Sequence, residues 1–127
     1  MRIDKLTSKL QTALADAQSI AVGKDHNFIE PVHLLLALMD QKSSSIKPLL
    51  KQAGAEPGRV RQAVAREIEN LPEVKGVAGD VSMSNDMGRL FNMADRLAQK
   101  RGDQYVSSEL MLLAALEDRG TLGRVLR

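Results

Sequence analysis

The chain has 127 residues, the usual length of one domain that buries its own hydrophobic core. It contains no cysteine, which excludes disulfide scaffolds, thiolate nucleophiles and cysteine-bound zinc. With 18 basic and 16 acidic residues its net charge is only +2, a weak overall field. No apolar run reaches the roughly 18 residues that cross a bilayer, and the start MRIDKLTSK lacks the apolar core of a secretory signal, so we expect a cytoplasmic protein without membrane contact.

Composition and apolar spacing predict helices in the first half of the chain. Two Phe, one Tyr and no Trp, against abundant Ala, Leu, Met, Gln, Lys and Arg, favour helix almost everywhere and strand almost nowhere. Taken in order, apolar residues three and four apart predict a helix that ends at Gly23 and an apolar helix from Pro31. A third helix is capped by Ser45 and ends at Gly54, and a fourth follows Pro57. We predict an all-α fold.

The second half repeats this order after a linker over about 72–83, which is rich in turn formers. Its first helix ends at Gly102, its second runs from Ser108 to about Glu117, and TLGRVLR over 121–127 begins a third. The predicted domain is therefore one unit over 1–127, with a first copy over about 4–71 and a second over about 84–127. Because the second copy stops before its last helices, we expect a fragment of a longer chain.

The two copies align in one register, with 6–40 on 83–117, which we term the repeat register. It pairs 15 of 18 apolar positions of the first segment with apolar residues of the second, although only five pairs are identical. Repeats of this kind indicate units that cannot bury their apolar faces alone. We therefore predict a duplicated four-helix unit whose two copies pack about a pseudo-twofold axis, with the second copy truncated at its C-terminus.

Specific sequence motifs accompany the repeat. The first copy reads MRIDKLTSKLQTALADAQSIA and then FIEPVHLLLAL, and the second contains LAQKRGD and SSELMLLAALE. These stretches resemble the amino-terminal (Clp N) domain of the Clp family of AAA+ unfoldases over essentially the whole chain. Members that work with a protease tend to read GTEHLL at the second helix of both copies, whereas EPVHLL and SSELML are similar to the ClpB disaggregase branch.

The resemblance implies a mobile, substrate-receiving domain on the rim of a hexameric stress-response chaperone. Such a domain binds exposed apolar segments of unfolded or aggregated polypeptides weakly and delivers them to the ATPase pore, with a co-chaperone system as a further partner. The isolated domain is expected to be monomeric. Because G-x-x-x-x-G-K-[ST] is absent from the chain, we expect no enzymatic activity and no cofactor here, with ATP and magnesium confined to separate ATPase modules.

Candidate apolar contacts come from differences between the copies. Leu90, Met93 and Leu97 form a stripe beside the core stripe of their helix, and Leu110 replaces a histidine of the first copy. A wide apolar face suits a binder of unfolded segments, which share little beyond apolar side chains, and methionine adapts to many shapes. The alternative interpretation is that Met93 and Leu110 pack against the other copy.

Three polar candidates follow from the resemblance, namely Thr7, Asp103 and Glu109, which would form a polar edge able to bond to a peptide backbone. Each also has a local interpretation. Thr7 or Ser8 can cap the first helix, Ser8 making a capping box with Gln11. Asp103 suits a turn after a helix-ending glycine, and Glu109 complements the dipole of its helix.

Two other classes of function stay open. The domain could dock a folded adaptor or co-chaperone, which predicts saturable binding of one partner and indifference to denatured chains. Binding of nucleic acid is disfavoured by the near-neutral charge and the few aromatic residues. His26 and His33 lie seven residues apart without further ligand motifs, so we expect no metal site and no catalytic residues.

Overall fold

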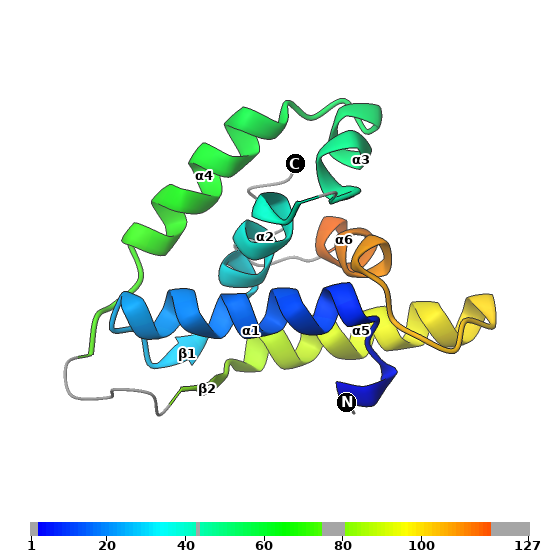
Figure 1. The fold of residues 1–127 in the computed structure, drawn as a ribbon, viewed down its shortest axis with the longest axis horizontal. Helices are drawn as coiled ribbons and strands as arrows, with labels where there is room; N and C mark the ends of the chain where they lie inside the picture. Colours follow the sequence, from blue (N-terminus) through cyan, green and yellow to red (C-terminus); the bar gives the residue numbers. More distant parts are fainter. Residues whose placement is uncertain (1–2, 43, 75–80, 118–127) are drawn as a thin grey trace.

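A computed structural model of the protein describes residues 3–42, 44–74 and 81–117 (Figure 1). Within these residues lie six α-helices, a short 3-10 helix and two strands of two residues each. In chain order they are η1 (Ile3–Lys5), α1 (Ser8–Gly23), β1 (Phe28–Ile29), α2 (Pro31–Asp40), α3 (Ile46–Gln52), α4 (Pro57–Glu69), β2 (Ser82–Met83), α5 (Asn85–Arg101) and α6 (Ser108–Leu116).

The predicted all-α class is confirmed, and the six helices occupy the predicted segments. None of the helices in the described ranges has both the length and the apolar character that crossing a membrane requires. The predicted helix start over 121–127 and half of the linker, 75–80, lie outside the described residues.

Helix α2 lies at the centre of the molecule because it is apolar on nearly every side. Eight of its ten residues are buried, and α1, α3, α4 and α5 pack around it. Helix α1 meets it with small side chains, since Ala13, Ala17 and Ala21 have no exposed surface. Alanine at these positions lets the two helix backbones approach closely, which buries the apolar surface of α2.

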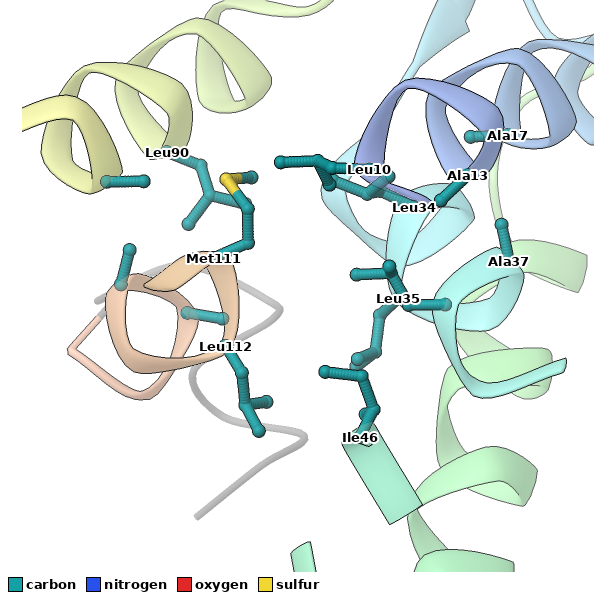
Figure 2. Close-up of a cluster of buried hydrophobic side chains, with 14 of the residues drawn as sticks. Leu10, Ala13, Ala17, Leu34, Leu35, Ala37, Ile46, Leu90, Met111 and Leu112 are labelled. Atoms are coloured by element: carbon teal, nitrogen blue, oxygen red, sulfur yellow. The ribbon is translucent and has the colours of Figure 1, made fainter. Parts of the chain in front are cut away.

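Helix α6 is the second apolar centre. It packs against α5 and α3, and its side chains point toward those of α2 (Figure 2). Leu34 and Leu35 of α2, Met111 and Leu112 of α6 and Leu90 of α5 are all buried there. The space left among them is about 10 Å³, at the lower limit for one water molecule. The two halves of the chain therefore share one close-packed core.

Two short parallel pairings join the first half of the chain to the second. Ile29 of β1 pairs with Met83 of β2, and Leu6 forms an isolated bridge with Val106. The repeat register aligns Leu6 with Met83 and Ile29 with Val106, so each pairing is the counterpart of the other. The two contacts are therefore equivalent under the repeat register, while the duplicated four-helix unit itself stays a prediction.

Backbone hydrogen bonds show the same equivalence. The N–H of Thr7 donates to the carbonyl of Val106 at 3.0 Å, and the N–H of Ser84 donates to that of Ile29 at 3.2 Å. The composition favours no strand, and β1 and β2 were not predicted. A two-residue strand carries no alternating pattern, and it forms here because the packed helices bring distant segments together.

The first helix cap differs in part from the prediction. The Oγ1 of Thr7 accepts a hydrogen bond from the N–H of Leu10 at 3.3 Å, and Ser8 is already the first helical residue. The side chain of Gln11 donates to the carbonyl of Leu6 at 2.9 Å. The predicted capping box of Ser8 with Gln11 is therefore wrong, because that motif needs Ser8 to precede the helix, whereas Thr7 holds that position.

The cap of α3 also differs. Ser45 precedes the helix as predicted, but its side chain makes no capping bond. The Oγ of Ser44 instead accepts from the N–H of Ile46 at 3.1 Å. The Oγ of Ser45 donates to the carboxylate of Glu109 on α6. Ser45 therefore bonds to a distant residue and does not cap its own helix.

Two helix-ending glycines give a test of the backbone geometry. Gly102 follows α5 with a φ of +74°, whereas Gly23 is the last residue of α1 and Asp25 takes the positive φ of 58° in the following turn. Gly102→Ala should lower the free energy of unfolding by about 1 to 2 kcal/mol, because a Cβ disfavours the left-handed region. Gly23→Ala should raise it by about 0.5 to 1 kcal/mol. Urea unfolding of both variants measures the difference, and equal effects would contradict this geometry.

Candidate functional site

The apolar stripe predicted on α5 and α6 lies mostly inside the molecule. Leu90 and Leu110 are only 4% and 3% exposed and belong to the shared core. Met93 and Leu97 are half-buried and pack against that core. The burial favours the packing interpretation for Leu90 and Leu110, while contact of any of the four with a substrate stays a prediction.

The three polar candidates all have local partners. Thr7 caps α1, and its N–H bond to Val106 places it beside the segment that joins Asp103 to Glu109. The carboxylate of Asp103 lies 3.4 Å from the Nε of Arg101. An oxygen of Glu109 accepts a hydrogen bond from Ser45 at 2.9 Å, which links α6 to the start of α3. Both carboxylates are also exposed, so a role in binding stays a prediction for them and for Thr7.

A pocket of about 140 Å³, which we term the α1/α5 pocket, lies between these two helices. It is lined by Ile3 of η1, Leu6, Leu14 of α1, Met83 of β2, and Gly88, Phe91 and Asn92 of α5. Ile3 and Met83 are 59% and 44% exposed, whereas Leu6 and Phe91 are buried. Only one lining side chain, the amide of Asn92, is polar. The pocket is therefore an apolar hollow with exposed apolar residues beside it.

The pocket lies where the two predicted copies meet. Leu6 and Met83 are counterparts in the repeat register, and so are Leu14 and Phe91. Both members of each pair line the pocket. The first member comes from one half of the chain and the second from the other, so neither half forms this hollow alone.

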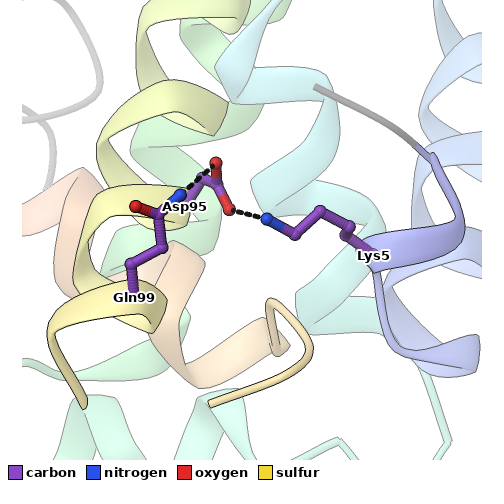
Figure 3. A network of polar contacts seen from close by, with 3 residues as sticks. All are labelled: Lys5, Asp95 and Gln99. Atoms are coloured by element: carbon purple, nitrogen blue, oxygen red, sulfur yellow. Dashed lines mark hydrogen bonds and ion pairs between the residues drawn. The ribbon is translucent and has the colours of Figure 1, made fainter. Parts of the chain in front are cut away.

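Polar contacts hold η1 in place beside the pocket (Figure 3). The Nζ of Lys5 lies 2.8 Å from Oδ1 of Asp95 on α5, and the side chain of Gln99 donates to Oδ2 of the same carboxylate at 3.2 Å. The N–H of Val106 donates to the carbonyl of Lys5 at 2.7 Å. Together these bonds fix the short segment that carries Ile3 and thus one wall of the pocket.

Gly88 has no packing reason to be glycine. Glycine inside a helix costs about 0.5 to 1 kcal/mol relative to alanine. Its φ is not positive, and a Cβ added there would meet nothing within 4 Å. What the absent side chain does provide is open space on the α5 wall of the α1/α5 pocket.

The pocket was not predicted from the sequence. The apolar spacing that predicts the helices agrees with the burial of Leu6 and Phe91 but says nothing of a hollow between them. The available signal was Gly88, an isolated glycine in a helical pattern, where the first copy has Gln11. Ile3 and Met83 carried no comparable signal because their neighbours are set by tertiary contacts.

A buried pair of histidines lies at the start of α2. His26 and His33 are 4% and 0% exposed, and Nδ1 of His26 lies 3.0 Å from Nε2 of His33. The N–H of Glu30 donates to Nδ1 of His33 at 2.8 Å as part of a capping box. Burial, and secondarily the Coulombic repulsion between the two rings when both carry a proton, lowers the pKa of His33 from 6.5 to about 4. Within the described residues no three side chains of His, Cys, Asp or Glu gather as metal ligands would.

Comparison with known proteins gives consistent matches to one family. The family described as the Clp repeat N-terminal domain matches residues 5–127. The chaperone protein ClpB of Pseudomonas putida is 57% identical over 126 residues, covering 99% of this chain and 15% of that protein. ClpB of Vibrio cholerae is 50% identical over 127 residues, covering 100% and 15%. The chain thus spans about 15% of the length of these relatives.

Solved structures share the fold. The Hsp104 N-terminal domain from Candida albicans is 24% identical with a TM-score of 0.84, over 95% of this chain and 79% of that one. The N-domain of ClpV from Vibrio cholerae is 28% identical with a TM-score of 0.78, over 90% and 68%. A ClpV N-domain in complex with a VipB peptide is 28% identical with a TM-score of 0.76, over 90% and 69%.

Thr7 can be tested for a role beyond its cap. Thr7→Ala should lower the free energy of unfolding by about 1 kcal/mol because the N–H of Leu10 loses its acceptor, and Thr7→Ser should restore the stability. Chemical unfolding of the three proteins measures the cap. If Thr7→Ser is stable yet binds an unfolded polypeptide as poorly as Thr7→Ala, the threonine methyl group itself contacts the substrate.

The low pKa of His33 predicts a pH-dependent stability. Below pH 6.5 the histidine of the unfolded chain is protonated, whereas His33 of the folded chain stays neutral down to about pH 4. The free energy of unfolding therefore falls as the pH drops from 6.5 to 4 and does not depend on this group above pH 6.5. From pH 7.5 to 5 the loss from this group should be about 2 kcal/mol. That range avoids the carboxylates of Asp40, Glu56 and Glu69, whose pKa values are lowered from 3.8, 4.5 and 4.5. A flat profile in urea unfolding would contradict the burial of a neutral His33.

Proposed function

The chain belongs to the Clp N-terminal domain family, and from that premise we propose that it is the substrate-receiving domain of a ClpB-type disaggregase. In this role it binds exposed apolar segments of unfolded or aggregated polypeptides weakly and transiently. It then delivers them to the pore of a hexameric ATPase. The domain itself acts without ATP or magnesium, which serve the ATPase modules of the whole protein in the cytoplasm.

The observation that supports this proposal is the α1/α5 pocket, an apolar hollow bordered by exposed apolar side chains. Ile3 and Met83 leave apolar side-chain surface exposed at the edge of the pocket, where a bound apolar segment can cover it. An apolar cavity of about 150 Å³ holds a benzene ring, so a hollow of about 140 Å³ suits one leucine or phenylalanine side chain. The amide of Asn92 can bond to the backbone of the same segment.

The size of the pocket also sets the strength of binding. Burying one leucine or phenylalanine side chain contributes about 1.5 to 3 kcal/mol, whereas a Kd of 1 mM corresponds to about 4 kcal/mol. A single pocket therefore holds a polypeptide only weakly, and six domains of a hexamer gain from their number. Weak binding suits delivery, because a domain that held its substrate tightly would oppose threading into the pore.

Docking of a folded adaptor or co-chaperone is the second candidate function. The observation that bears on it is that a ClpV N-domain of the same fold forms a complex with a VipB peptide, which is a defined segment of one partner. An adaptor would bind saturably at one stoichiometry and would be indifferent to denatured chains. Titration with a permanently unfolded protein separates the two candidates.

The direct test is a backbone-amide and methyl NMR titration of the chain with a permanently unfolded protein. Shifts should gather on Ile3, Met83 and Phe91 if the pocket receives the polypeptide. Gathering on Met93 and Leu97 would instead favour the predicted α5 stripe, and Met93→Asp, which places the aspartate of the first copy there, should then abolish the shifts. No shifts at millimolar substrate would move the proposal to adaptor docking.

Gly88 provides the sharpest variant, because stability and binding should move in opposite directions. Gly88→Leu fills the pocket from α5 and should weaken binding about tenfold or more, while helix propensity raises the free energy of unfolding by about 0.5 to 1 kcal/mol. Gly88→Ala should give the same stabilisation with much less loss of affinity. Arg96→Leu, which adds an exposed leucine to α5 outside the pocket lining, is the matched control. Equal affinity of Gly88→Leu and the unchanged protein would contradict the pocket.

A further inference from the structure

We propose that the buried His26–His33 pair is an acid-sensitive lock that holds β1 and, through it, Met83 beside the α1/α5 pocket. The strand β1, Phe28–Ile29, lies between the two histidines in the chain. The effect on substrate binding rests on the proposed function, whereas the lock itself rests only on the contacts of the two rings. It adds regulation by protons to a site whose role so far is only binding.

The hydrogen bonds around His33 assign its protons. A backbone N–H can only donate, so Nδ1 of His33, which receives the N–H of Glu30 at 2.8 Å, must be unprotonated. The single proton of the neutral ring is then on Nε2, which donates to Nδ1 of His26 at 3.0 Å. His26 in turn carries its proton on Nε2. The three groups thus form one chain of bonds in a fixed direction, from Glu30 through His33 to His26.

No proton can be added to Nδ1 of His33 or to Nδ1 of His26 without breaking this chain of hydrogen bonds. A proton on Nδ1 of His33 would meet the N–H of Glu30, so the capping bond of α2 would be lost. A proton on Nδ1 of His26 would meet the Nε2–H of His33, and turning the proton of His33 to its other nitrogen again breaks the bond to Glu30. Two buried donors would then face each other, which is costly in a site shielded from solvent.

The surroundings offer little compensation for a positive charge. Helix α1 presents buried alanines toward α2, and the N–H of His26 donates to the carbonyl of Ala21. The nearby carboxylates are Glu30 at the start of α2 and Glu69 on α4, with Lys24 and Asp25 in the turn before His26. Glu69 is already paired with Lys24, whose Nζ lies 2.5 Å from its carboxylate. The carboxylate whose pKa responds to His26 is therefore neutralised by another cation.

The lock is connected to the α1/α5 pocket through one pairing. Ile29 pairs with Met83, and the N–H of Ser84 donates to the carbonyl of Ile29 at 3.2 Å. Met83 lines the pocket. When the bonds on either side of β1 are lost, this pairing loses the support that positions Met83.

The other half of the chain supplies an internal control. In the repeat register the bond from Ser84 to Ile29 has its counterpart in the bond from Thr7 to Val106. At the counterparts of His26 and His33 the chain has Asp103 and Leu110. The second pairing therefore has the same backbone geometry and no histidine, so acid should loosen only the first.

Amide hydrogen exchange measured by NMR at pH 7.5 and pH 5 tests the lock. After correction for intrinsic exchange, protection of the Glu30 and Ser84 amides should fall about thirtyfold, the factor expected for a group that titrates near 6.5 when unlocked and near 4 when locked. Protection of the Thr7 amide should change less than about threefold. An equal fall at all three amides, or no fall at Ser84, overturns the local lock.

Two variants complete the test. His33→Gln keeps an acceptor for the N–H of Glu30 but does not titrate, so the acid-dependent fall at Ser84 should shrink to that at Thr7. His33→Leu places the residue of the second copy there and should do the same if the glutamine variant does not fold. A fall that persists in these variants overturns the assignment to His33. Substrate affinity at both pH values then reports separately: a lock that opens without loss of affinity leaves the lock intact and contradicts only its link to the pocket.

Discussion

Two helices that are apolar on almost every side, α2 and α6, have most of their residues buried, and the rest of the structure follows from covering them. Each is covered in part by the other half of the chain, since α5 packs on α2 and α3 packs on α6. Their side chains therefore meet, and Leu35 and Leu112 lie in a core with almost no free space. The amphipathic helices α1, α4 and α5 then close the outside.

This arrangement explains why a pocket forms between α1 and α5. Each of these long helices packs mainly on one apolar helix, α1 on α2 and α5 on α6. The contact between α1 and α5 is therefore less extensive than either of these. The pairings of Leu6 with Val106 and Ile29 with Met83 bring the starts of both long helices into place. Between them, Gly88 leaves space that a larger side chain would fill. Both halves of the chain line this hollow, so it forms only when the two halves are packed together.

The two halves share a framework but differ in what they add to it. The first half buries two histidines where the second has Asp103 and Leu110, and it caps α2 with Glu30 where α6 begins after Ser107. One pairing therefore depends on protonation and its counterpart does not. Hydrogen bonds between buried polar groups are costly to disturb, so the contact between the two histidines persists at neutral pH and is lost only when a proton is added.

The sequence by itself determined the helical class, the six helices, the repeat register and the family, because these depend on local propensity, on apolar spacing and on short sequence motifs. It also placed Leu90 and Leu110 on apolar faces, but an apolar face looks the same whether it is buried or exposed. Only the tertiary structure decided that both are buried, that Thr7 rather than Ser8 caps α1, and that β1 and β2 exist. It alone revealed the α1/α5 pocket and the contact of His26 with His33, because these depend on distances between residues that the chain order does not specify.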